Sequence, residues 1–116
     1  MRISVHEQGG FADLDRRIDI DGAIVKITDA KPRRRTRSGP LGPAQQKQVE
    51  KLATQMAAVN QNAVSKVEDL PPDAMITRIA VEDQGVRRML KVVSGADVPG
   101  VVWEFLGLLR SVSSSI

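Results

Sequence analysis

Residues 17–28, RIDIDGAIVKIT, carry the strongest structural signal in the chain, a predicted β-hairpin. Apolar and polar side chains alternate on both sides of Asp21-Gly22, which is the period-two pattern of a half-buried strand. An Asp-Gly pair favours the positive φ angles that a two-residue type I′ turn requires. The sequence therefore predicts antiparallel strands over residues 17–20 and 23–28.

Further segments extend this hairpin into a sheet. Residues 2–6, RISVH, alternate in the same way. Residues 33–38, RRRTRS, follow a turn signal at 29–32 and can pair back as an edge strand. Residues 75–81 and 86–93 flank the tetrapeptide EDQG, which predicts a second hairpin. We therefore expect an antiparallel sheet of about four to six strands.

Two amphipathic segments predict helices. Pro43 suits the first helical position, because the N–H that proline lacks would have no partner there. Residues 43–60 place apolar side chains at i, i+3, i+4 and i+7. Residues 98–112 carry a similar apolar stripe and follow Asp97, a residue type favoured at N-caps. The expected order is strands, helix, hairpin and helix.

This order predicts an α+β domain in which two helices pack on one face of the sheet. Polar groups such as Ser4, His6 and Arg78 are then expected on the other face. A chain of 116 residues, 41% of them hydrophobic, suits one modest core. We place a single domain at residues 1–112 and expect a frayed tail at 113–116.

The composition also indicates in which cellular compartment the protein is expected. The chain has no cysteine, so neither disulfides nor thiolate chemistry are available. Its first ten residues lack the apolar stretch of a secretory signal, and no run approaches the roughly 20 apolar residues of a membrane span. These features predict a cytoplasmic protein that contacts no membrane.

The excess of positive charge is local. It comes from a basic run that comprises Arg33, Arg34, Arg35 and Arg37. Without these four, 13 basic side chains remain against 14 acidic ones. Such a run either keeps an edge strand soluble and unpaired, or binds phosphates or an acidic protein face. With two Phe, one Trp and no Tyr, a base-stacking platform is disfavoured, and so is nucleic acid as the partner.

No catalytic or metal-binding constellation is evident. Residues 6–10, HEQGG, begin like the zinc motif H-E-x-x-H, but Gly10 stands where the second histidine belongs, and His6 is the only histidine. There is no G-x-S-x-G element, and the four aspartates between positions 13 and 21 lack the apolar surroundings that raise an acid's pKa. We expect a binding protein, not an enzyme, with no metal or other cofactor of its own.

Several short motifs, in their order and spacing, resemble the emfourin family. They are the opening MRI, GGFA at 9–12, Leu41-Gly42-Pro43 before the first helix, Leu70-Pro71, the hairpin at 75–93, and a last helix that contains a Trp. Emfourins are small bacterial inhibitors of thermolysin-like zinc metallopeptidases such as protealysin. The similarity covers nearly the whole chain and departs at Asp13, where the family pattern commonly continues with glycine. It implies a peptidase inhibitor, which we expect to be monomeric when free.

The resemblance implies a target-binding loop after the first strand. Its expected residues are Glu7, Gly9, Gly10, Phe11, Ala12, Asp13 and Leu14. The two glycines let the backbone come close to a partner's cleft. Phe11 or Leu14 would suit the pocket for a large apolar side chain just after the scissile bond, and an acidic side chain, from Glu7, Asp13 or Asp15, could approach the zinc.

Alternatives stay open for the aromatic residues and for the function. Phe11 could instead cover the core, with Gly9-Gly10 as a bulge or turn. Trp103 could form an interaction surface, although burial at the helix edge is the favoured prediction. The other candidate functions are a basic adaptor for nucleic acid or an acidic protein, acting through Arg33–Arg37, and a small oligomer. Further contacts could come from the turns at 21–22 or 82–85.

Overall fold

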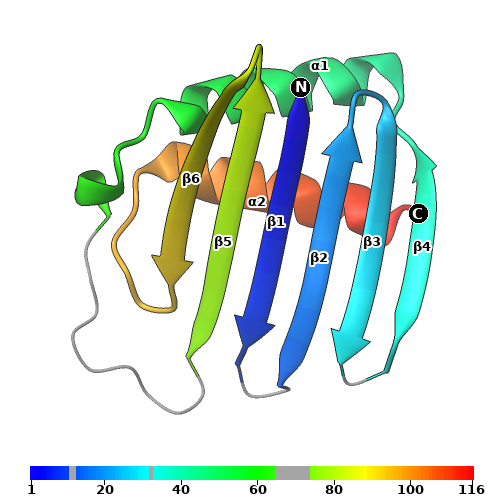
Figure 1. The fold of residues 1–116 in the computed structure, drawn as a ribbon, viewed down its shortest axis with the longest axis horizontal. Helices are drawn as coiled ribbons and strands as arrows, with labels where there is room; N and C mark the ends of the chain where they lie inside the picture. The colour runs from blue at the N-terminus through cyan, green and yellow to red at the C-terminus, as the bar shows by residue number, and fades with distance from the viewer. Residues whose placement is uncertain (11–12, 32, 65–73) are drawn as a thin grey trace.

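A computed structural model describes residues 1–10, 13–31, 33–64 and 74–116, and it shows one antiparallel sheet with both helices behind it (Figure 1). The strands are β1 Arg2–Gly9, β2 Leu14–Asp21, β3 Ile24–Lys31, β4 Arg35–Pro40, β5 Met75–Asp83 and β6 Val86–Val93. The helices are α1 Pro43–Ala57, the 3-10 helix η1 Gln61–Ala63, and α2 Gly100–Ser114. The strand order β4-β3-β2-β1-β5-β6 leaves β4 and β6 at the edges. The predicted α+β class is confirmed.

Both predicted hairpins are present, and both are longer than predicted. Strand β2 pairs with β3 from Asp15 to Asp21, and Gly22 has a φ of +59° in the turn between them. Strand β1 continues past the predicted end at residue 6 to Gly9, and β2 therefore starts earlier, at Leu14, to pair with it. The first two strands thus meet in a short loop of residues 10–13.

Apolar side chains from the sheet and both helices form one core. On the helix side of the sheet, Ile3 and Val5 of β1 lie opposite apolar partners on β2 and β5. Helix α2 covers them with Phe105, which is fully buried. The remaining buried apolar residues include Ile18, Ile20, Val25, Ile27, Val49, Ala53, Met56, Ile79, Val81, Leu90, Val92, Val102, Leu106, Leu109 and Val112.

The helix boundaries differ from those predicted. Helix α1 ends at Ala57 and not at residue 60, and α2 begins at Gly100 with Pro99 as its N-cap, so Asp97 does not cap it. The last helix also continues through Ser114, where we expected a frayed tail from residue 113. Ser113 is buried, and its hydroxyl donates to the carbonyl of Leu109 at 2.7 Å. Within the described ranges, no helix is long and apolar enough to cross a membrane.

Helix α2 turns Trp103 away from the core. The Trp103 side chain is 48% exposed, so its predicted burial is wrong. The buried stripe instead passes through Val102, Phe105 and Leu106, and Trp103 falls just beside that stripe because successive helical residues are rotated by about 100°. Leu106 is 2% exposed and lies within the stripe.

Candidate functional site

The loop between β1 and β2 is held at its base by two backbone hydrogen bonds. The Gly10 N–H donates to the carbonyl of Ala74, which precedes β5, and the Asp13 N–H donates to the carbonyl of Gly10, both at 3.2 Å. The first bond joins the loop to the segment before β5, and the second joins the two described ends of the loop. Phe11 and Ala12, which we predicted to contact the target, lie outside the described residues.

The backbone at this loop adopts conformations that few residues tolerate. The φ angles of Gly9, Gly10 and Asp13 are +95°, +77° and +49°. A Cβ on Gly9 would lie 2.5 Å from the carbonyl oxygen of Ala74, which is closer than real Cβ contacts. Gly9 therefore has to be glycine, and Asp13 belongs to a residue type enriched in the left-handed region. Leu14, the first residue of β2, is half-buried.

Glu7 does not belong to this loop. It lies within β1, its side chain faces the helices, and the residue is 7% exposed. Its Oε1 atom is 3.5 Å from Nη2 of Arg110 on α2. On the neighbouring strand, Arg16 lies opposite Glu7 and donates to Asp29 of β3 at 2.7 Å. Glu7 is therefore poorly placed for the predicted contact with a target, because its carboxylate is buried and paired with Arg110 within the fold.

The open face of the sheet is polar, as predicted. Ser4, His6 and Arg78 all lie on this face, and His6 Nε2 is 2.6 Å from Oδ1 of Asp15. A carboxylate only accepts, so His6 donates. This hydrogen bond is the main reason that the pKa of Asp15 lies below its ordinary value. Among the described residues, no group of three or more His, Cys, Asp or Glu side chains is placed to hold a metal ion.

The basic run has members with different roles. Arg33 and Arg34 lie exposed between β3 and β4, and Arg35 is the exposed first residue of β4. Arg37, two residues further on, faces the helices and is half-buried. Its Nη1 donates to the carbonyls of Ser113 at 3.3 Å and Ile116 at 3.1 Å. Arg37 thus supplies positive charge and donors to the end of α2, where the carbonyls lack helical partners.

Replacing Arg37 with alanine is expected to lower the free energy of unfolding by about 1–2 kcal/mol, because it leaves these carbonyls without their charged donor. Urea denaturation would measure the change. Arg35→Ala removes the same charge from the same strand at an exposed position, and it should change stability by at most about 0.5 kcal/mol. Equal losses in the two variants would contradict the capping role.

The β1–β2 loop and the β3–β4 loop lie at the same end of the sheet, the lower end in Figure 1. An ion pair joins them, with Lys31 Nζ 3.5 Å from Oδ2 of Asp13. The turns at 21–22 and 82–85 lie at the opposite end, so they cannot extend an interface built on the β1–β2 loop. Among the connections between paired strands, the β3–β4 loop is thus the one that shares this end with the β1–β2 loop.

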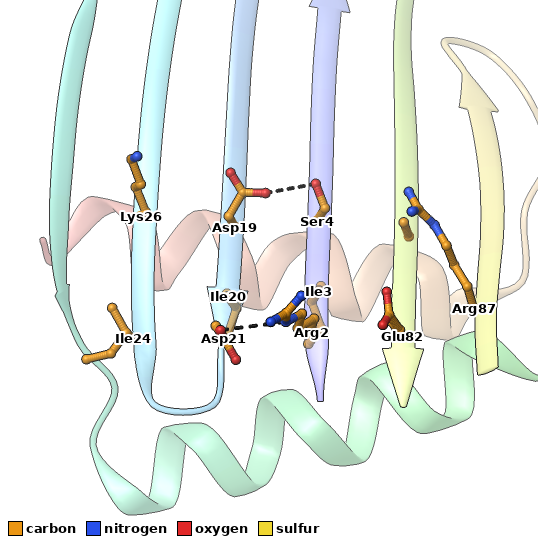
Figure 2. Close-up of a pocket in the computed structure, with 11 residues that line it drawn as sticks. Arg2, Ile3, Ser4, Asp19, Ile20, Asp21, Ile24, Lys26, Glu82 and Arg87 are labelled. Carbon is orange, nitrogen blue, oxygen red and sulfur yellow. Dashed lines mark hydrogen bonds and ion pairs between the residues drawn. The ribbon is translucent and has the colours of Figure 1, made fainter. Parts of the chain in front are cut away.

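A shallow pocket of about 420 Å³ lies at that opposite end, on the open face (Figure 2). Its lining is Arg2, Ile3, Ser4, Asp19, Ile20, Asp21, Ile24, Lys26, Ala80, Glu82 and Arg87. Acidic and basic groups alternate across neighbouring strands, and Arg2 Nε is 3.7 Å from Oδ2 of Asp21. Sequence reasoning missed this pocket because its residues come from five strands. Its charges compensate one another, so they favour no class of ligand.

No family model matches this chain, and no curated protein or solved structure matches it. What the chain binds is therefore inferred from its own residues.

Proposed function

We propose that this chain is a protein inhibitor of a thermolysin-like zinc metallopeptidase and that its β1–β2 loop occludes the active-site cleft. The observation that carries the proposal is the base of this loop, where the Gly10 N–H donates to the carbonyl of Ala74 before β5 and the Asp13 N–H donates to the carbonyl of Gly10. A loop whose base is held by hydrogen bonds before binding loses less conformational entropy when it enters a cleft. Strands β1 and β2 fix its position from both sides.

The conformation of Asp13 is compatible with the emfourin pattern. The pattern commonly has glycine at this position, and Asp13 has a positive φ, which glycine adopts without strain. The departure in sequence therefore does not require a different path of the backbone. This supports the inference from GGFA to a loop that presents Phe11 to a partner.

Occlusion requires no catalytic residue and no cofactor in this chain, because the zinc belongs to the target. Inhibitors of proteases bury on the order of 1,600 Å² in total, which four loop residues cannot supply alone. The β3–β4 loop is placed to add to the contact. Glu7 is enclosed within the fold, so Asp13, which is exposed, is the better placed acidic residue of this loop.

We further propose that the free protein is a monomer in the cytoplasm, where it would protect the producing cell from its own prematurely active peptidase. Deleting the gene should then increase intracellular proteolysis, measured as turnover of labelled cytoplasmic proteins. Unchanged turnover in a strain that makes the peptidase would contradict this role. Light scattering would test the monomeric state.

Phe11→Ala is expected to weaken inhibition at least tenfold while the protein stays folded, since the loop would lose its largest apolar group. Residual activity of thermolysin and of the producing organism's own thermolysin-like peptidase, titrated with the variant, would measure the change. Trp103→Ala is the matched control, because it removes an exposed aromatic residue from α2, and it should change inhibition less than twofold.

Three outcomes would count against the proposal. Wild-type protein that leaves the producing organism's own peptidase active would contradict the inhibitor function. Equal inhibition by wild type and Phe11→Ala would remove Phe11 from the interface. A fall in the melting temperature of Phe11→Ala that accounts for its lost inhibition would assign Phe11 to the core.

A further inference from the structure

The two ends of the sheet differ in charge. At the end with the β1–β2 loop, Lys31, Arg33, Arg34 and Arg35 are exposed. Of these, Lys31 is paired with Asp13, and in the described part of the chain no ion pair involves the three arginines. Among the described residues, this end therefore presents an excess of positive charge beside the β1–β2 loop.

The opposite end is balanced by comparison. There Asp21, Glu82 and Asp83 stand with Arg2, Arg87 and Arg88 on the ends of β1, β2, β5 and β6. Arg2 lies opposite both Asp21 and Glu82, so acidic and basic groups alternate across the strands. Among the described residues, the excess of basic over acidic side chains is therefore found at the end of the sheet that carries the β1–β2 loop.

The contacts among the described residues assign a structural role to two members of the basic run and none to the other two. Arg37 caps α2, and Arg35 lies opposite Asp29 on the helix side of the sheet. Arg33 and Arg34 are exposed in the β3–β4 loop, and among the described residues they take part in no sheet pairing and no ion pair. A role in keeping the edge strand soluble suits Arg35, which lies in β4. It suits Arg33 and Arg34 less well, because both precede β4.

We propose that Arg33 and Arg34 form a second contact of the inhibitor, with an acidic surface beside the cleft of the target peptidase, and that they accelerate association. This inference rests on the proposed function. Because neighbouring strands are about 4.8 Å apart, the β3–β4 loop lies two strand spacings, or about 10 Å, from the β1–β2 loop. That distance is close to the Debye length at physiological salt, so a partner seated on one loop is within the field of the other.

Two charge-reversal variants test this proposal. Arg33→Glu/Arg34→Glu reverses two charges at the end of the sheet that carries the β1–β2 loop. Arg87→Glu/Arg88→Glu changes the net charge by the same amount at the opposite end. All four arginines are exposed. Association rate constants would be measured from the onset of inhibition of thermolysin and of the producing organism's own thermolysin-like peptidase, at low and high salt. Circular dichroism and melting curves would establish that both variants are folded.

At low salt, Arg33→Glu/Arg34→Glu is expected to slow association at least tenfold, and Arg87→Glu/Arg88→Glu no more than threefold. The rate for wild type should fall about tenfold from low to high salt, and the three proteins should converge at high salt. Dissociation should change less than association, because charges at the rim of an interface act chiefly on encounter.

Other results would overturn the proposal. Equal slowing by both variants would assign the effect to net charge, and equal rates for all three proteins would remove the arginines from the interface, with the inhibitor function intact in either case. Absence of inhibition by wild type would instead refute the proposed function. Submicromolar binding of duplex DNA at physiological salt, lost in Arg33→Glu/Arg34→Glu, would assign the arginines to nucleic acid.

Discussion

Phe105→Ala is expected to lower the free energy of unfolding by about 3–5 kcal/mol, as truncation of a fully buried Phe does. The Phe105 side chain is 0% exposed and lies on the face of α2 that packs against the sheet. Alanine would remove its ring from the core and leave a cavity that rigid strands cannot close. Of the two aromatic residues that the structure describes, Phe105 and Trp103, Phe105 is therefore the one that the core depends on.

Trp103→Ala is the matched control for this prediction. Trp103 lies two residues earlier on the same helix and is 48% exposed, so its replacement should cost at most about 1 kcal/mol. Urea denaturation followed by far-UV circular dichroism would measure both variants. Similar losses would show that α2 also packs through Trp103, and they would contradict the assignment of the core.

The paired strands could be predicted because their signals are local. Asp21-Gly22 fixes a turn by its own backbone preference, and period-two alternation on either side needs no knowledge of the rest of the chain. The end of β1 could not be predicted in this way. Residues 6–8, HEQ, are all polar, and Glu7 occupies the helix side where the pattern requires an apolar side chain.

The charge at Glu7 is tolerated because of a residue that is distant in sequence. Arg110 reaches Glu7 from α2, and the sequence alone gives no sign of that contact. The same holds for Arg37, which stands in a run that indicates a basic surface but bonds to the end of the last helix. Pairing across the tertiary structure decides which charged residues remain available to a partner.

The sequence alone predicts where the β1–β2 loop lies along the chain. It does not predict which other segments lie beside that loop. GGFA indicates a loop after the first strand, and in the structure β1 ends at Gly9 and β2 begins at Leu14. Which other segments share that end of the sheet depends on the direction of every strand. The topology puts the turns at 21–22 and 82–85 at the opposite end and the β3–β4 loop at the same end.

Gly9→Ala is expected to lower the free energy of unfolding by about 3 kcal/mol. The residue has a φ of +95°, and its new Cβ would lie 2.5 Å from the carbonyl oxygen of Ala74. This obstacle is backbone, so it cannot rotate aside as a flexible side chain would. Either β1 and the segment before β5 separate here, or Gly9 changes its conformation and the neighbouring bond from Gly10 to Ala74 is lost.

Gly22→Ala separates the effect of the clash from that of the backbone angle. Gly22 also has a positive φ, +59°, but a Cβ there meets no atom within 4 Å, so the substitution should cost only about 1 kcal/mol. Thermal and urea denaturation would compare the two variants, and inhibition would be assayed where both are folded. Because the close approach of Gly9 to Ala74 allows the bond from Gly10 to Ala74, the Gly9 variant should also inhibit more weakly, whereas Gly22→Ala should inhibit like wild type. Equal stability of the two variants would contradict the close approach of Gly9 to Ala74, and full inhibition by folded Gly9→Ala would show that the inhibitor does not depend on an anchored loop.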